Sequence, residues 1–192
     1  LLRFAFGSCA KSGLTNTPSL WQRIAQDKPQ LFLWGGDAVY SPSAERVDLQ
    51  SSYHQMLHAS TGYRRHVRDA MVVEGTWDDH DLGRNDGSGQ SLGDHLRNDS
   101  QALFLNFLGV PLTSPRRTRS GVFSSHSWGG VGSNEVVVLL LDTRTHRAFH
   151  LIPSLGGFKT PLLPIMPITA AVLRWMTVFF RQGGAFTGDV LG

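Results

Sequence analysis

MVVEGTWDDHDLGRND, residues 71–86, joins a short apolar run to a dense group of ionisable and amide side chains. The run Met71 to Val73 is typical of a short buried strand. Four acids and a histidine follow within residues 78–86, and such a group repels itself unless positive charge lies among its members. Carboxylates, amide oxygens and imidazole are common ligands of divalent and trivalent cations. The stretch therefore favours a metal site, with a solvated acidic loop as the alternative.

Three other apolar runs, near residues 2–6, 31–34 and 136–141, also end in polar residues. Their endings are GSC at 7–9, GGDAVY at 35–40 and DTR at 142–144. Continuous apolar runs suggest strands buried on both faces, and helices between them suggest parallel crossovers. We therefore expect an α/β fold whose four strand ends lie along the carboxyl edge of one sheet, where ligands bind in open α/β folds.

The segments between these runs carry helix and turn signals. We expect helices over residues 17–25, 43–58, 63–70 and 91–108, with Gly109 ending the last one, and a strand over 121–128. The basic segment 115–119 is interpreted as a solvated loop rather than a substrate clamp.

The strand-end side chains each allow two interpretations. Asp37 could bridge two metals while Tyr40 binds as a phenolate, or Asp37 could cap the following turn while Tyr40 packs. Cys9 could be a thiolate ligand, which would favour iron or zinc, or a small buried apolar residue. Asp142 and Arg144 could be a ligand and an anion clamp, or an ion pair that locks the sheet edge.

Composition limits the function classes. The chain of 192 residues is 41% hydrophobic, enough for one real core. Its net charge of +3 is mild and forms no basic stripe, so we expect no nucleic acid as a specific partner. A single cysteine excludes an internal disulfide. The sequence contains no serine-nucleophile motif, Walker loop or paired C-x-x-C ligands.

Residues 148–188 form a proline-interrupted apolar segment that ends in an expected helix over 168–180. Thirteen residues are too few to cross a bilayer, which needs about 20. We expect an insertion that packs on the protein or on a neighbour rather than contact with a membrane. No signal peptide is visible, and the chain enters a strand pattern without an initial methionine, so we expect that it is cut from something longer.

Taken together, these motifs resemble the PhoD-like (alkaline phosphatase D) metallophosphatases. FGSCA, GGDAVY, TWDDHDLGRND, the SPRR loop and LLLDTR occur in the order and approximate spacing of that family, from residue 3 to about 147. The G-D-x-x-Y motif is also shared with purple acid phosphatases. The resemblance implies a metallophosphoesterase αββα sandwich that hydrolyses phosphomonoesters or phosphodiesters at a two-metal site with a metal-bound hydroxide as nucleophile.

The resemblance also implies roles for individual residues. Cys9, Asp37 and Tyr40 would bind Fe³⁺, and Asp78 and Asn85 would bind Ca²⁺ or another divalent cation. Asp79, His80 and Asp81 would shape the site around them, and we expect Asp79, His80 and Arg144 to be the catalytic side chains acting on a phosphate-ester substrate. Ser41-Pro42 replaces an acid that the family often carries after the tyrosine, so any extra ligand there is lost.

By the same resemblance, residues 1–192 are one partial catalytic domain, the N-terminal half, with a divergent apolar insertion at about 148–188. A C-terminal half would supply a histidine and further acids that complete the site, and an extracytoplasmic location is implied. We expect the 192-residue chain alone to be weakly active or inactive. Two alternatives stay open: a non-catalytic metal-binding module, and a truncated, inactive homologue that acts through protein contacts.

Overall fold

The computed structural model describes residues 2–11, 18–58, 62–130, 135–148 and 172. The helices and strands in chain order are β1 (Phe4–Gly7), α1 (Pro18–Gln26), β2 (Leu31–Gly35), α2 (Arg46–His58), the π-helix η1 (Arg64–Arg68), β3 (Val72–Thr76), the 3₁₀-helix η2 (Asp79–Leu82), α3 (Gly89–Leu92), α4 (Asp94–Leu108), the 3₁₀-helix η3 (Pro115–Arg117), β4 (Ser124–Trp128) and β5 (Val136–Leu140).

The first three strands form a parallel sheet in the order β1-β2-β3. Leu31 lies opposite Phe4 on one side and Val72 on the other, so the three strands start level with one another. Helix α1 connects β1 to β2, and α2 with η1 connects β2 to β3. The prediction of parallel strands from the first three apolar runs is therefore confirmed, and their carboxyl ends share one edge.

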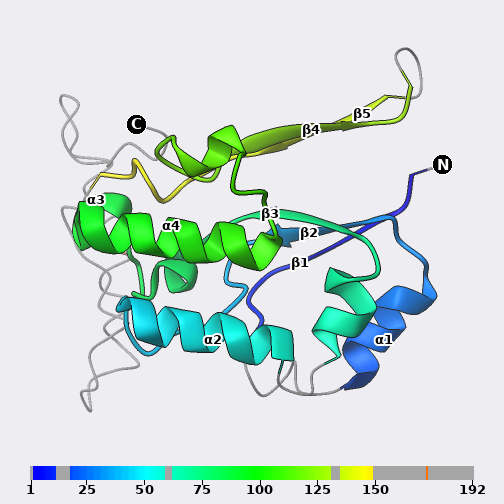
Figure 1. Cartoon of the computed structure of the whole chain (residues 1–192), viewed down its shortest axis with the longest axis horizontal. Coiled ribbons are helices and arrows are strands. Elements are labelled where there is room, and N and C mark those ends of the chain that lie inside the picture. The colour runs from blue at the N-terminus through cyan, green and yellow to red at the C-terminus, as the bar shows by residue number, and fades with distance from the viewer. Residues whose placement is uncertain (1, 12–17, 59–61, 131–134, 149–171, 173–192) are drawn as a thin grey trace.

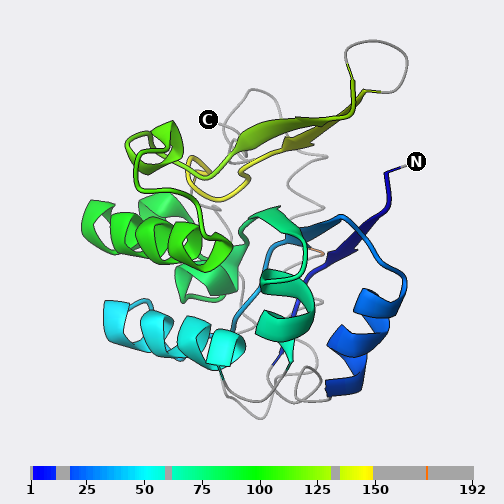
Figure 2. The same cartoon turned by 45° about the vertical axis from the view of Figure 1, so that its right-hand side comes forward.

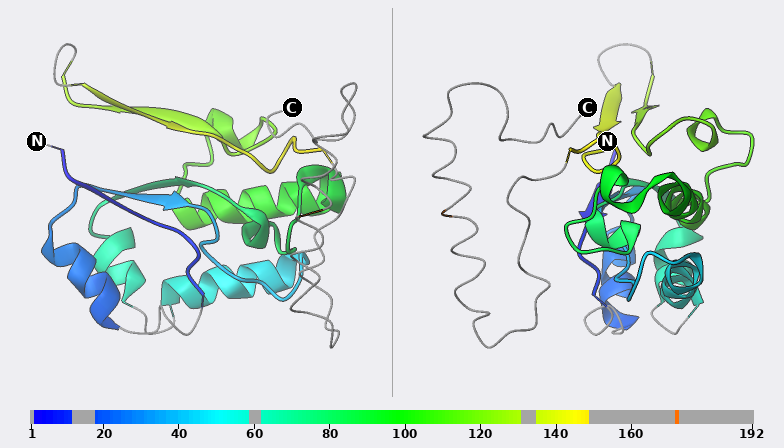
Figure 3. Two further views of the ribbon diagram at one scale, coloured as in Figure 1. Left: turned by 180° about the vertical axis from the view of Figure 1, so that it is seen from behind. Right: turned by 90° about the vertical axis from the view of Figure 1, so that its left-hand side faces the viewer.

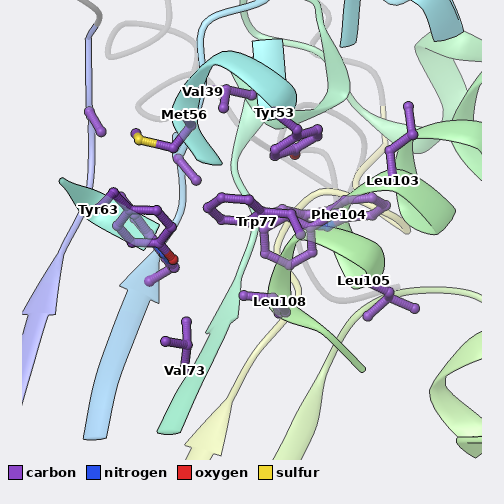
Figure 4. Close-up of a cluster of buried hydrophobic side chains, with 14 of the residues drawn as sticks. Val39, Tyr53, Met56, Tyr63, Val73, Trp77, Leu103, Phe104, Leu105 and Leu108 are labelled. Atoms are coloured by element: carbon purple, nitrogen blue, oxygen red, sulfur yellow. The ribbon is translucent and has the colours of Figure 1, made fainter. Parts of the chain in front are cut away.

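Helices cover one face of this sheet (Figure 1). Large aromatic side chains form the core between the sheet and these helices. The indole of Trp34 in β2 donates a hydrogen bond of 2.9 Å to the hydroxyl of Tyr63, and Tyr63 stacks on Phe107 of α4 at 5.5 Å between ring centroids. Figure 4 shows side chains of α2, α4 and the end of β3 meeting in the same core. Burial of each such side chain contributes about 1.5–3 kcal/mol, which fixes the sheet against α2 and α4.

The other face of the sheet is open over the described residues. Phe4, Phe6 and Val72 are 51%, 78% and 50% exposed, and no described helix lies in front of β1 when the molecule is seen from behind (Figure 3). The strands alternate between a packed face and this open one, as in a sheet covered on one side. The expectation that these strands are buried on both faces is therefore wrong for the described part of the chain.

The fourth apolar run does not join the parallel sheet. β5 pairs antiparallel with β4 in a separate two-stranded sheet, which extends from the body of the molecule (Figure 2). The buried guanidinium of Arg116 bridges the two sheets, because it donates to the carbonyls of Gly75 in β3 and of Val122 just before β4. The end of β5 still reaches the end of β3, where the Thr76 hydroxyl donates 2.7 Å to the Leu141 carbonyl.

Two expected helices differ from the structure in detail. The helix expected over 91–108 is split at Gly93 into α3 and α4, and the one over 63–70 is a single π-helical turn. Gly109 ends α4 as predicted, in a left-handed conformation at φ 73°, and a side chain there would collide with the guanidinium of Arg68.

The apolar segment 148–188 and its helix lie outside the described residues, apart from residues 148 and 172. No helix of the described residues is long and apolar enough to cross a membrane.

Candidate metal centre

Backbone hydrogen bonds hold the loops after β1 and β2 together. The amides of Cys9 and Ala10 donate to the carbonyls of Gly36 and Asp37 at 3.2 and 2.9 Å. Gly36 adopts φ 103°, and a Cβ atom at this position would lie 2.6 Å from Cβ of Asp78. Only glycine therefore lets the loops after β2 and β3 come this close. The loops after β1, β2 and β3 therefore form one continuous surface at the carboxyl edge of the sheet.

Asp37 lies at the centre of that surface. Its side chain is buried, and its Oδ2 accepts hydrogen bonds from the Tyr40 hydroxyl at 3.0 Å and the Cys9 thiol at 3.7 Å. Its Oδ1 accepts from the amide of His80 at 3.2 Å. Burial raises the pKa of Asp37, and the carboxylate of Asp79 adds to the effect. Asp37 therefore faces the loop from β1 and its own loop at once, rather than capping a turn.

The capping role belongs to Asp81, which is fully buried. Its carboxylate accepts from the amides of Asp37, Ala38 and Asp78 at 2.6, 3.0 and 3.0 Å, from the amide of Val39 at 3.4 Å and from the Tyr53 hydroxyl at 3.2 Å. Burial raises the pKa of Asp81 to about 7. Its oxygens are committed to the backbone of two loops, so Asp81 shapes the surface on which Asp37 lies and is not directed at a ligand.

Asp79 and His80 face the same space as Asp37. Ligand atoms of these three side chains lie within 4.8 Å of one another, a spacing that allows them to hold a metal ion. The imidazole of His80 also packs on the Tyr40 ring, with 4.2 Å between centroids. Both residues lie in η2, where Asp81 is bonded on the buried side, so the turn directs Asp79 and His80 outward.

A second acidic group lies beside the first and is neutralised by arginine. Arg144, which follows β5, forms ion pairs with Asp78, with Asp79 at 3.7 Å and with Asp86 at 3.5 Å. Arg147 pairs with Asp86 at 2.9 Å. Burial alone would lower the pKa of Arg144, but the three carboxylates outweigh it and raise the pKa. This guanidinium is therefore a fixed positive charge within the acidic cluster.

Asp142 is not a partner of the Arg144 guanidinium. Its carboxylate accepts from the Trp77 indole at 2.9 Å, the Val122 amide at 2.8 Å, and both the amide and the hydroxyl of Thr145 at 2.9 and 2.6 Å. Burial would raise the pKa of Asp142, but these hydrogen bonds outweigh it and hold the pKa below its usual range. The proposed Asp142–Arg144 ion pair is therefore wrong, and Asp142 instead joins the ends of β3 and β5.

The structure brings together most of the side chains selected from the sequence. Cys9, Asp37 and Tyr40 are in contact, and Asp78 is paired with Arg144. Asn85 is exposed. The ligand roles of all five residues stay predictions, as do the catalytic roles.

Cys9 is exposed rather than buried, and three residues of the surface, Cys9, Asp37 and Asp86, adopt positive φ of 54–55°. Non-glycine residues in this left-handed region cluster at functional sites.

The role of Arg147 was not predicted from the sequence, and that of Arg116 was predicted wrongly. Arg147 lies three residues after Arg144 in a D-T-R-T-H-R pattern, and that repeat of arginine was the available signal. Arg116 is buried, and it pairs with Glu74 at 2.8 Å, so the expectation of a solvated loop is wrong at this position. The neutralising acid lies 42 residues away in β3, which no local pattern indicates.

The comparisons with known proteins give one structural match and no match in sequence. The fold is similar to that of PhoD. A solved structure described as "Structure of PhoD" aligns with a TM-score of 0.55 and 17% sequence identity, covering 78% of this chain and 33% of that chain. The chain thus spans about a third of the PhoD chain, and the likeness is one of fold. No family model matches the chain, and no curated protein matches it in sequence.

Proposed function

We propose that the chain carries part of the active site of a metal-dependent phosphoric ester hydrolase, a phosphomonoesterase or phosphodiesterase. The observation that carries the proposal is the buried Asp37 carboxylate, flanked by the Cys9 thiol and the Tyr40 hydroxyl and faced by Asp79 and His80. The PhoD-like fold supports the same reaction class. By this proposal a further segment, corresponding to more of the PhoD chain, completes the site.

The chemistry of the donor set supports a cation at Asp37. Two hydrogen-bond donors that can lose their protons, a thiol and a phenol, both point at one buried carboxylate oxygen. A trivalent ion such as Fe³⁺ would exchange those protons for metal–ligand bonds to Cys9, Asp37 and Tyr40, since thiolate, carboxylate and phenolate all bind iron. When bound, such a cation supplies the charge that lowers the pKa of a water molecule and polarises the phosphoryl oxygens.

Asp78 and Asn85, which were expected to bind a second cation, lie in surroundings unlike those of Asp37. The carboxylate of Asp78 is paired with Arg144, and the Asn85 side chain is exposed. Because the Asp78 carboxylate is already paired with a guanidinium, it does not fit a second cation in this arrangement, and we assign no step of the reaction to one.

The residues of the chain then have distinct tasks. Asp37 holds the cation in a fixed place because Asp81 bonds the backbone of its loop. Asp79 and His80 face the phosphoryl group beside it, and His80 carries a proton to the leaving oxygen, since imidazole is the side chain most often used as a general acid. Arg144 orients Asp78 and Asp79 rather than clamping the substrate directly.

Hydrolysis of a chromogenic phosphodiester, measured together with metal content, tests the proposal. We expect Asp37→Asn to remove the bound metal and any hydrolysis together, while the circular dichroism spectrum is unchanged. Exposed Asp27→Asn serves as the matched control, because it makes the same chemical change away from the site. Full metal content with unchanged hydrolysis in Asp37→Asn would contradict the proposal.

A second candidate function is action through protein contacts, without catalysis. The open sheet face favours it, because the side chains of Phe4, Phe6 and Val72 are all at least half exposed. Two results together would favour this candidate over the first. The chain would bind metal but hydrolyse no phosphodiester with any metal tested, and Phe6→Ser would abolish binding of a protein partner.

A further inference from the structure

The guanidinium of Arg144 lies where the second acidic group converges. Its three nitrogens pair with three different carboxylates: Nε with Asp78, Nη2 with Asp79 at 3.7 Å and Nη1 with Asp86 at 3.5 Å. The Arg144 side chain is only 15% exposed. Asp79 belongs to both acidic groups, since its carboxylate also lies within reach of Asp37 and His80. The guanidinium is therefore next to the proposed cation site and separated from it by one carboxylate.

We infer that Arg144 fills, with its own charge, the position that a second cation would need, so that the centre binds a single cation beside Asp37. The inference rests on the proposed function, because it describes how many cations that site holds. Asp78, expected from the sequence to bind the second metal, is then a partner of Arg144.

The charges of the described residues favour this assignment. Asp78, Asp79 and Asp86 carry three negative charges, and Arg144 and Arg147 return two positive ones. The two guanidiniums therefore offset much of the negative charge that a second divalent cation would need. The Asp37 carboxylate has no arginine or lysine as an ion-pair partner among the described residues, so the unbalanced charge lies on its side of Asp79.

Arg144 is also held from its backbone side, so it is not easily displaced. Its backbone amide donates to the Asp142 carboxylate at 3.0 Å, and its Nη1 donates to the carbonyl of Gly87 at 3.3 Å. Asp142 is itself fixed by Trp77 and Thr145. An entering cation would have to break several charge-assisted bonds and leave a mostly buried guanidinium without its carboxylate partners, which is costly.

Counting the bound ions tests the inference. The full 192-residue chain is equilibrated with Fe³⁺ and with Ca²⁺, and the ions per chain are counted by native mass spectrometry and elemental analysis. We expect one ion per wild-type chain. Arg144→Gln should bind two, with an affinity for added Ca²⁺ at least about tenfold above that of the wild type, because two freed carboxylates then face it.

Two variants control for lost charge and lost packing. Arg147→Gln removes the same charge from a residue that touches only Asp86 of the three acids, and we expect it to keep one ion. Arg144→Lys keeps the charge and should also bind one. Thermal unfolding verifies that each variant is folded, and two ions on the wild-type chain would overturn the inference even if Arg144→Gln does not fold.

The outcomes separate this inference from the function on which it rests. Two ions on the wild-type chain, one of them lost in Asp78→Asn, would overturn the role of Arg144 and leave the metal-dependent hydrolase standing. No ion on the wild-type chain in either metal would overturn both. One ion on the wild type and one on folded Arg144→Gln would overturn the inference alone.

Discussion

The loops after β2 and β5 are each organised by a buried aspartate, yet the two aspartates titrate in opposite directions. Asp81 beneath the first loop has its pKa raised to about 7, whereas Asp142 at the second has its pKa held below the usual range. Both carboxylates accept hydrogen bonds from several backbone amides and from side chains. Asp81, however, is fully buried with the carboxylate of Asp37 close by, which adds to the cost of its charge.

The same contrast extends to the side chains that these two aspartates position. On the Asp142 side each acid of the loop after β3 other than Asp81 is paired with Arg144 or Arg147, so the chain itself supplies the positive charge beside them. On the Asp81 side the Asp37 carboxylate meets a thiol, a phenol and a peptide amide, which are all uncharged. Charge that the chain balances internally is structural, and charge that it leaves unbalanced is where we expect a cation from solution to bind.

Removing Asp81 should have the largest effect. Asp81→Ala leaves four amides and the Tyr53 hydroxyl without their acceptor, at a cost of at least about 4 kcal/mol in the free energy of unfolding. Urea unfolding measures it. Tyr53→Phe deletes a single one of these donors and should cost about 1 kcal/mol. Equal losses in the two variants would contradict the scaffold role of Asp81.

Removing Asp37 should affect binding rather than stability. Asp37→Asn keeps the shape of the side chain but removes the central anion, so we expect the affinity for Fe³⁺ to fall at least about 100-fold, equivalent to about 2.7 kcal/mol. The free energy of unfolding without metal should change by less than about 1 kcal/mol, because the amide can still accept from Tyr40. Competition with a chelator measures the affinity, and a large loss of stability would place Asp37 with the structural carboxylates instead.

Removing Asp142 should cost about 2 kcal/mol at neutral pH, since an amide can replace only part of its hydrogen bonding. The pKa of Asp142 is lower in the folded than in the unfolded chain. Its contribution is therefore fully present above the unfolded-state pKa near 3.9 and is lost as the pH falls through that value toward the folded pKa. The difference in urea midpoint between wild type and Asp142→Asn should shrink on going from pH 7 to about pH 3. A difference that grows on acidification would contradict the assigned shift.

The smallest expected effect concerns the Thr145 hydroxyl, which donates 2.6 Å to Asp142. Thr145→Val preserves the shape and should cost about 1 kcal/mol in the free energy of unfolding. The metal affinity should be unchanged, because Thr145 donates to Asp142 and not to Asp37. A fall in metal affinity to the level of Asp37→Asn would show that the two sides are not separate.

Much of the fold follows from local patterns. The apolar runs at 2–6, 31–34 and 71–73 and the turn residues after them predicted parallel strands with polar ends, and the structure has β1, β2 and β3 there. The convergence of Cys9, Asp37 and Tyr40 follows from that topology. The run at 136–141 was assigned to the same sheet because its residues are as apolar as those of β2, and apolar content alone does not identify the partner strand.

What the sequence did not reveal depends on contacts between distant residues. The pairing of Arg144 with Asp78 spans 66 positions, and that of Arg116 with Glu74 spans 42. An arginine that neutralises an acid and an arginine in solvent have the same local sequence signal. The sequence therefore could not show which acids of residues 78–86 are paired with arginine. That became visible only from the position of the end of β5 beside the end of β3.

The most direct test of this account is the visible absorption spectrum of the chain titrated with Fe³⁺. If Asp37 and its neighbours form the cation site, the titration should produce a tyrosinate-to-iron charge-transfer band that saturates, and Tyr40→Phe should abolish the band while the protein stays folded. A wild-type chain that binds Fe³⁺ without such a band, or a band that persists in Tyr40→Phe, would contradict it.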